Sequence, residues 1–374
     1  MPASAPPGGA APQRGGPSST PLGDRPWRRF LPPGLFVLAL IVVWWLRRPD
    51  DRVLSTFTGQ AQGTTWTVKL VTPEPLSADA NVAVGQTVRA ELERVDASMS
   101  TWRKDSEISL FNQHLASTPF PVSPPFAQVI SLARQVSEAS GGVFDVTVGP
   151  LVEAWGFGPN GERTLPTEAE LTALRARVGY QRLHLEGPAE QRTLRKEAPD
   201  ARVDLSAIAQ GYTVDLITEA LLAQGYTDLY VEVGGETRAQ GRNAGGRTWQ
   251  VGIERPTDTE QAIHRVVPLN GTSLATSGDY RRYREQDGQR LSHTVDPRTG
   301  RPIGHRLASV TVIHASCALA DAWATALNVL GPDEGLALAQ RLGLAALFLV
   351  RTPDGRWVER ASDTFQGVAG KISQ

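Results

Sequence analysis

Near the C-terminus, a carboxylate and a hydroxyl are spaced one helical turn apart. Asp321 and Thr325 lie in the segment SCALADAWATALNVL, residues 316 to 330, with small alanines beside them. Residues four apart share one face of a helix, and hard oxygen donors with small neighbours suit Mg²⁺ and leave room for a phosphate. An Asp and a Thr on the polar face of a helix, opposite its apolar stripe, are more often simply solvated. The spacing alone leaves both interpretations open.

A histidine precedes this helix in a predicted hairpin. Asp287-Gly288 lies between two alternating stretches, which is typical of a two-residue β-turn. The turn predicts that His293 stands in the middle of the second strand, on the same face as Leu291 and Val295. Histidine changes charge near neutral pH and can act as a base, but a lone histidine between Leu and Val is more often a packed residue.

Two further carboxylates lie among small and apolar residues. Asp145 belongs to SGGVFDVTVGPLVEAWGFG, residues 140 to 158, and Asp204 to VDLSAIAQGY, residues 203 to 212. We expect Asp204 at the end of a short strand and Ser206 as the N-cap of the next helix, whose exposed amides would suit an anionic ligand. Both carboxylates are equally compatible with caps or turns.

One glycine pattern is misleading. Residues 156 to 161, GFGPNG, match the G-x-G-x-x-G motif for dinucleotide phosphates, but that motif requires a strand before it and a helix that begins inside it. Here a predicted helix precedes the glycines and a turn follows them. We therefore expect no Rossmann site.

The elements that must position these residues are a mixture of strands, in which apolar and polar residues alternate, and helices, in which apolar residues recur every three or four positions. Residues 64 to 71 predict a strand, and residues 82 to 98 and 124 to 139 predict helices. Later strand-like and helix-like stretches do not follow a strict βαβ order. They are VTVGPLVEAW, LSAIAQGYTVDLITEALLAQG, DLYVEVGG, TWQVGIERP, LASVTVI and SCALADAWATALNVLG. The sequence predicts an α+β fold with at least one substantial sheet.

Composition narrows the function classes. The chain has 374 residues, with 38 basic and 39 acidic side chains and a net charge of -1. This balance argues against a nucleic-acid partner. Its single cysteine, Cys317, cannot form an internal disulfide or build a zinc site by itself.

The N-terminal region differs from the rest of the chain. Residues 1 to 30 are rich in Pro, Gly and Ala, and predict a disordered tail. Arginines flank the apolar block 31 to 46, LPPGLFVLALIVVWWL, on both sides. Arg28 and Arg29 come before it, and Arg47 and Arg48 follow it. It is a little shorter than the ~20 residues of a typical span, but its tryptophans suit an interface. The block predicts an uncleaved membrane anchor, with a buried helix as the less favoured alternative.

From about Thr58 to Arg351 the chain resembles the ApbE-type FAD:protein FMN transferases. The resemblance is carried by MSTWRKDSEISLFN, SGGVFDVTVGPLVEAWGFG, VDLSAIAQGYTVD, VEVGGETRAQGRN, ATSGDYRRY, RLSHTVDPRTGRPI and SVTVIHASCALADAWATALNVLG, in the family's order. It implies an α+β fold of mixed sheets and packed helices around a nucleotide-binding cleft, with a catalytic domain over residues 54 to 365.

The resemblance also implies site residues. The predicted contacts to FAD are Gln62, Trp102, Val143, Phe144, Asp145, Asp204, Gln210 and Val295. The predicted Mg²⁺ ligands are the backbone carbonyl of Ala207 with the side chains of Asp321 and Thr325. His293 is the candidate that would act on the acceptor hydroxyl or the pyrophosphate, and Asp321 is the second predicted catalytic residue.

The implied activity is Mg²⁺-dependent transfer of the FMN part of FAD to a Thr or Ser hydroxyl of an acceptor flavoprotein, with release of AMP. Acceptors would belong to membrane electron-transfer complexes. The anchor predicts a single-pass protein of the inner membrane with its catalytic domain on the periplasmic or extracytoplasmic side. Two alternatives remain open: an FAD pyrophosphatase that uses water as acceptor, and a non-enzymatic FAD-binding protein.

Overall fold

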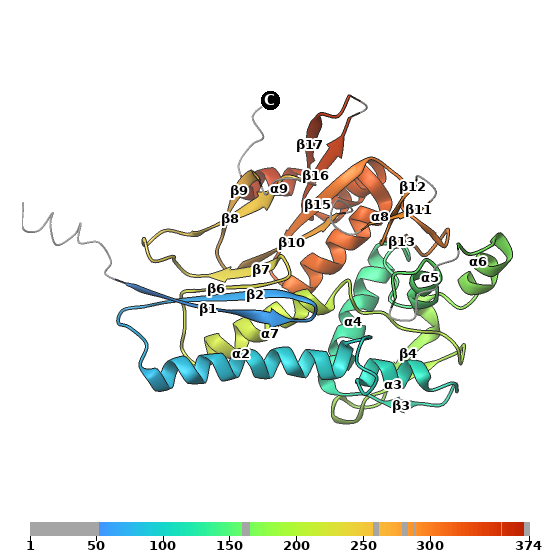
Figure 1. Cartoon of the computed structure of the whole chain (residues 1–374), viewed down its shortest axis with the longest axis horizontal. Coiled ribbons are helices and arrows are strands. Elements are labelled where there is room, and N and C mark those ends of the chain that lie inside the picture. The colour runs from blue at the N-terminus through green and yellow to red at the C-terminus, as the bar shows by residue number, and fades with distance from the viewer. Residues whose placement is uncertain are drawn as a thin grey trace, which may run out of the picture. The chain divides into compact units, whose positions relative to one another are not determined.

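An antiparallel sheet dominates the computed structural model, which describes residues 52–158, 165–256, 262–278, 283–286, 289–352 and 354–369 (Figure 1). Within these residues the sheet has eight strands in the order β1-β2-β6-β7-β10-β15-β16-β17. The strands are β1 (Val53–Ala61), β2 (Thr64–Thr72), β6 (Leu229–Val233), β7 (Glu236–Gln240), β10 (Thr272–Gly278), β15 (Leu307–His314), β16 (Ala345–Arg351) and β17 (Trp357–Ala361).

Four helices provide the core on one side of this sheet. They are α2 (Ala78–Met99), α4 (Pro124–Ala139), α7 (Ala209–Ala223) and α8 (Cys317–Leu342). Apolar side chains of α2 and α7 pack against β2 and β6. Those of α4 and α8 pack together and against β15 and β16. Helix α8 is therefore enclosed by both the sheet and other helices.

The opposite face of the sheet is covered by a hairpin and a short helix. Strands β8 (Trp249–Glu254) and β9 (Ile263–Leu269) pair antiparallel with each other, and α9 (Asp363–Ala369) lies beside them (Figure 1). Trp249, Val251, Val267 and Phe365 share an apolar cluster with residues of β10 and β16. This hairpin is a second layer over the sheet.

Smaller elements complete the fold. Three short helices are α3 (Glu107–Gln113), α5 (Gly149–Ala154) and α6 (Glu168–Arg175), with 3-10 turns at Tyr180–Arg182 and Ala189–Gln191. Strands β3 (Phe120–Pro121), β5 (Thr193–Lys196) and β4 (Leu183–Glu186) form a small sheet. Two further pairs are β11 (Tyr283–Gln286) with β12 (Gln289–Ser292), and β13 (Val295–Asp296) with β14 (Arg301–Pro302).

Local signals explain several element boundaries. Helix α4 begins where Ser123 accepts a hydrogen bond from the amide of Phe126, with prolines in the first turn. Helix α3 begins at Ser106, whose hydroxyl accepts from the amide of Ser109. The expected helix over 124 to 139 and the α+β class are confirmed.

Strands β11 and β12 pair antiparallel with Gln286 opposite Gln289, as the predicted hairpin requires, while its turn residues Asp287 and Gly288 lie outside the described residues. The predicted tail 1 to 30 and anchor 31 to 46 lie outside the described residues. Among the helices that the structure does describe, none has both the length and the apolar character needed to cross a bilayer.

Candidate active site

A cavity of about 980 Å³ lies where α7, α8, the loop after α4 and the sheet meet. It collects the residues that the family resemblance points to, with the exception of Gln62. The predicted residues that line it are Trp102, Val143, Phe144, Asp145, Asp204, Ala207, Gln210, His293, Val295, Asp321 and Thr325. These positions come from five separate segments of the chain, so folding is what brings them together.

Asp321 is buried at the contact between α7 and α8. Its carboxylate accepts a hydrogen bond from the Gly211 amide at 3.1 Å, and the side chain is only partly open to the cavity. Gly211 is required there because a Cβ would lie 2.4 Å from the carbonyl oxygen of Cys317. Burial raises the pKa of Asp321 to about 7. Of the two interpretations that the spacing left open, the solvated helix face is wrong, because α8 is covered on both sides.

The oxygen donors around Asp321 fit a magnesium ion. Thr325 and Ala207 line the same cavity as Asp321, and these residues can offer a hydroxyl, a backbone carbonyl and a carboxylate. No cluster of three His, Cys, Asp or Glu side chains suited to a metal occurs in the described part of the chain. Mg²⁺ prefers oxygen ligands and keeps waters or phosphate oxygens in its shell, so one carboxylate is sufficient. A cation would also offset the cost of the buried charge of Asp321.

The segment after α4 presents Asp145 to the cavity in a fixed orientation. Gly141 and Gly142 have φ of 70° and 82° and turn the chain directly after the helix. One oxygen of Asp145 accepts from the amide and hydroxyl of Thr147, at 2.8 and 2.6 Å, and the other from the amide of Tyr180 at 2.8 Å. Burial raises the pKa of Asp145, while these hydrogen bonds oppose the rise.

The start of α7 differs from the sequence expectation. The helix begins at Ala209, and its N-cap, Ile208, makes no side-chain cap. Ser206 is not the N-cap; its amide instead donates to Asp204 at 2.9 Å. Asp204 follows an isolated bridge at Arg202 rather than a strand. The side chain of Asp204 accepts a hydrogen bond from the Ser206 amide, and the helix therefore starts two residues later than predicted.

His293 is not in the middle of a strand. Strand β12 ends at Ser292 and β13 begins at Val295, so the histidine lies in the bend between them. The Ser292 hydroxyl accepts from the Thr294 amide at 2.9 Å, and this local bond interrupts the strand. The imidazole is half-buried and meets the edge of Phe157, with ring centroids 6.5 Å apart. It lines the cavity together with Thr294 and Val295.

Phe157 belongs to the misleading glycine motif. Helix α5 precedes that motif, so the arrangement required for a Rossmann site is absent among the described residues of this segment. Phe157 and Gly158 line the cavity instead. The glycine pattern therefore contributes packing next to His293.

Gly234 and Gly235 form the tight turn between β6 and β7. Their φ values are 66° and 110°, and a Cβ on Gly234 would lie 2.8 Å from Nε2, the side-chain amide nitrogen of Gln210. The Gly235 amide donates to Glu232 at 2.8 Å. The turn is thus shaped to let Gln210 approach the backbone at the cavity wall.

Two predicted FAD contacts have contrasting positions. Trp102 is 73% exposed and lies at the rim of the cavity. Gln62 lies in the turn between β1 and β2 with a φ of 53°, and its side-chain amide donates to the Thr213 hydroxyl at 2.9 Å. Gln62 therefore contacts α7 rather than the cavity, and its role remains a prediction.

The cavity also includes residues that the sequence did not single out. Lys69, Tyr230 and Glu232 line it from β2 and β6, and all six residues of β8 border it. Only Glu232 falls in a stretch that carries the family resemblance, VEVGGETRAQGRN, and the resemblance gave it no role. These residues become neighbours only when the hairpin folds over the sheet.

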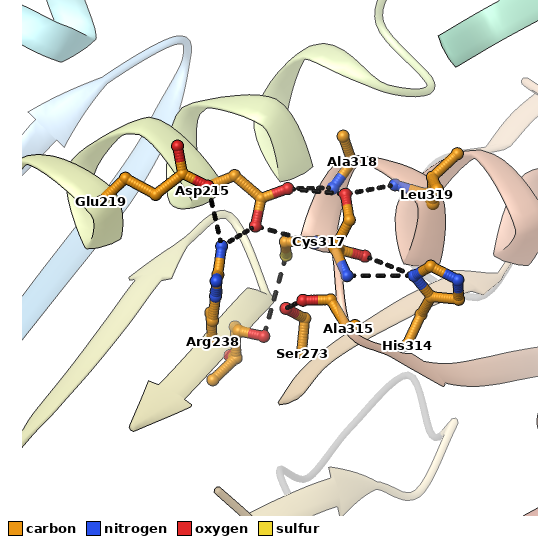
Figure 2. Close-up of polar contacts among 11 residues, drawn as sticks. Asp215, Glu219, Arg238, Ser273, His314, Ala315, Cys317, Ala318 and Leu319 are labelled. Atoms are coloured by element: carbon orange, nitrogen blue, oxygen red, sulfur yellow. Dashed lines mark hydrogen bonds and ion pairs between the residues drawn. The ribbon is translucent and has the colours of Figure 1, made fainter. Parts of the chain in front are cut away.

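A second carboxylate fixes the helix that carries Asp321. Asp215 of α7 accepts hydrogen bonds from the Ser316 hydroxyl and the amides of Cys317 and Ala318, at 2.7 to 3.1 Å. Arg238 of β7 donates to the same carboxylate at 2.7 Å. Figure 2 shows Asp215 between Arg238 and the first turn of α8. The negative charge at the amino end of α8 holds this helix in register with α7.

Comparison with known proteins identifies the family. The model of the ApbE family matches residues 62–348. The chain belongs to the ApbE family. This confirms the resemblance found in the sequence, and the matched region contains every predicted site residue.

Relatives of this ApbE chain carry a common name. A Vibrio cholerae protein named FAD:protein FMN transferase is 41% identical over 334 residues, covering 89% of this chain and 97% of its own. A protein of the same name from Escherichia coli strain K12 is 37% identical over 302 residues, covering 80% and 85%.

Solved structures agree with the fold. The flavin transferase ApbE from Vibrio cholerae has a TM-score of 0.77 at 41% identity, covering 85% of this chain and 99% of its own. The apo form of the flavinyl transferase ApbE from Pseudomonas stutzeri has a TM-score of 0.78 at 39% identity, covering 86% and 98%.

Proposed function

We propose that this enzyme transfers the FMN part of FAD to a threonine or serine hydroxyl of an acceptor protein and releases AMP. The observation that carries the proposal is the single cavity lined by all the predicted site residues except Gln62. The names of the relatives, FAD:protein FMN transferase and flavin transferase, support the same chemistry.

Magnesium is the proposed cofactor. Asp321 and Thr325, with the carbonyl of Ala207, would hold it, and this all-oxygen donor set supports the assignment. Bound there, Mg²⁺ would neutralise charge on the pyrophosphate.

The transfer step is a displacement at phosphorus. The acceptor hydroxyl oxygen attacks the phosphorus on the FMN side of the pyrophosphate and forms a new ester bond. The bond from that phosphorus to the bridging oxygen breaks, and AMP leaves with the electron pair. His293 takes the proton of the attacking hydroxyl, since imidazole is basic enough near neutral pH. Phe157 packs edge-on against the imidazole and limits its orientation.

The decisive experiment mixes the protein, FAD, Mg²⁺ and an unmodified flavin-acceptor domain. Covalent transfer gives a fluorescent protein band that survives denaturing electrophoresis. Free FMN and AMP without the band would indicate a pyrophosphatase instead. Tight FAD binding without either product would indicate a binding protein and would contradict the proposal.

The proposed setting is the inner membrane. The apolar block 31 to 46 with its flanking arginines supports a single-pass anchor, and its charge distribution favours a periplasmic or extracytoplasmic catalytic domain. Acceptors would be flavoproteins of membrane electron-transfer complexes. Protease added to intact spheroplasts should digest residues 53 to 374, whereas full protection of that region would contradict this orientation.

A further inference from the structure

Part of the cavity runs along one edge of the β8–β9 hairpin. All six residues of β8, Trp249–Glu254, line the cavity, and no residue of β9 does. Successive side chains of a strand point to opposite faces, so a cavity that borders every residue of β8 must follow its backbone edge. The cavity is therefore bordered by main-chain groups here, in addition to side chains.

This edge of β8 has no partner strand among the residues that the structure describes, since β8 pairs only with β9. Amide groups alternate in direction along an antiparallel strand. The Arg255 amide, directly after β8, donates to the Ala262 carbonyl at 2.7 Å and so points toward β9. Because the direction alternates, the amides of the odd-numbered residues of β8 also point toward β9. Gln250 stands opposite Pro268, and because proline has no N–H, these two residues cannot form a pair that exchanges two backbone hydrogen bonds. The amides of Gln250 and Gly252 therefore face the open edge.

A continuous path joins this edge to the proposed metal ligands. Strand β10 pairs with β7 only through Thr272–Leu274, so its last residues lie beyond that pairing. Thr276, Ser277 and Gly278 line the same cavity as Asp321 and Thr325, and β10 packs against α8, the helix that carries those two residues. An extended occupant of the β8 edge can reach the phosphate region without crossing the sheet.

The floor of this part of the cavity has mixed chemistry. The Lys69 ammonium lies 5.1 Å from the centre of the Tyr230 ring, and that ring lies 5.7 Å from the ring of Trp249. Glu232 follows on the same strand face as Tyr230. A cation, a carboxylate and two aromatic rings suit the varied side chains of a polypeptide.

We propose that the open edge of β8 binds the acceptor polypeptide as an added strand and thereby delivers its hydroxyl to the cavity. The inference rests on the proposed FMN transfer to protein, because that reaction requires a polypeptide to enter beside FAD. Strand addition uses main-chain hydrogen bonds for affinity and neighbouring side chains for specificity. Six residues of β8 offer about 20 Å of edge. None of the predicted FAD contacts belongs to β8.

The test compares two prolines placed opposite each other in the hairpin. Gly252→Pro removes an amide from the open edge while leaving the ladder to β9, and a Cβ there would meet only the exposed side chain of Ile263, at 3.3 Å. Val266→Pro alters the residue paired with Gly252, on the strand that does not line the cavity. The probe is an unmodified flavin-acceptor domain of a membrane electron-transfer complex.

For Gly252→Pro we expect about a tenfold rise in the KM for the acceptor, the equivalent of one lost hydrogen bond, with kcat and the FAD dissociation constant within about twofold of wild type. Val266→Pro should retain the wild-type KM. An unchanged acceptor KM in a folded Gly252→Pro variant would overturn the proposal, as would an equal rise in both variants.

Photo-crosslinking tests whether the acceptor docks at the edge of β8 without depending on turnover or on the stability of the proline variants. A photoreactive residue at the exposed position Gln250 should crosslink to the acceptor domain, and the same residue at Val266 should not. Equal crosslinking at both positions, or none at Gln250, would refute the docking edge. Crosslinking from position 250, together with a wild-type protein that never produces a flavinylated band, would instead refute the proposed transfer while supporting the edge.

Discussion

Two buried carboxylates at the contact between α7 and α8 have opposite surroundings. Asp215 of α7 accepts hydrogen bonds from the first turn of α8 and from Arg238. Asp321 of α8 accepts one from the Gly211 amide and otherwise borders the cavity. The saturated carboxylate has little capacity left for a ligand, whereas the other retains lone pairs for one. The partners of a buried charge, more than its burial, separate a structural role from a chemical one.

The largest effect is expected for Asp321→Asn. The amide keeps the shape of the side chain and can still accept from Gly211, so the fold should be retained. Loss of the only charged side chain in the proposed ligand set should abolish Mg²⁺-dependent transfer. Flavinylation rates and thermal melting should be measured on the same preparation. Wild-type rates in this variant would make Asp321 equivalent to Asp215, a structural carboxylate.

A smaller loss is expected for His293→Asn. Removing a base from the transfer step should reduce the rate by about 10² to 10⁴-fold, with little change in FAD affinity. If His293 only packs against Phe157, the variant should instead lose about 1 to 3 kcal/mol of stability and keep its activity. Acceptor flavinylation, FAD binding and melting temperature distinguish the two outcomes.

Asp215→Ala should show the reverse pattern. It removes the carboxylate that accepts three hydrogen bonds from the first turn of α8 and pairs with Arg238, so the free energy of unfolding should fall by about 2 to 4 kcal/mol. The matched control is Glu219→Ala, because the Glu219 carboxylate is largely exposed and lies 3.5 Å from the same arginine. The control should stay within about 0.5 kcal/mol of wild type. Urea unfolding measures both, and equal losses would remove the special role of Asp215.

The smallest effect concerns Lys196, a buried cation away from the cavity. Its ammonium donates to the carbonyls of Phe111 and Ala201, yet burial lowers its pKa to about 8. Between about pH 8 and 10 the unfolded chain therefore binds more protons at this position than the folded chain, and its contribution to stability rises with pH. Lys196→Met should lose that rise. Urea unfolding of both proteins at pH 7.5 and 9.5 gives the difference, and parallel pH profiles would contradict the assignment.

The sequence predicted well those elements that are specified locally. Helix α4 has a serine cap and prolines at its start, and β2 has strict alternation, so both were predicted within a residue or two. The residues of the cavity were found through family resemblance, because their positions are far apart in the chain. Spacing alone could not separate Asp321 from a solvated side chain.

The failures also have local physical causes. His293 was expected in a strand, but the Ser292 hydroxyl captures a nearby amide and ends the strand. Ser206 was expected as a cap, but Asp204 captures its amide. For Asp321 the spacing left open whether the side chain binds a metal or is solvated, because the alanines around it give no sign that both faces of α8 are covered. Such competition between side chain and backbone, and packing between distant segments, leaves no periodic signal.

The most direct test of the account is to locate the metal. Crystals soaked with FAD and Mn²⁺, a substitute for Mg²⁺ with a measurable anomalous signal, should show a peak within coordination distance of an Asp321 oxygen and beside the FAD pyrophosphate. No peak should appear at Asp215. A metal bound elsewhere, or FAD bound in the crystal with its pyrophosphate away from Asp321 and Thr325, would contradict the central claim that this cavity is the site of transfer.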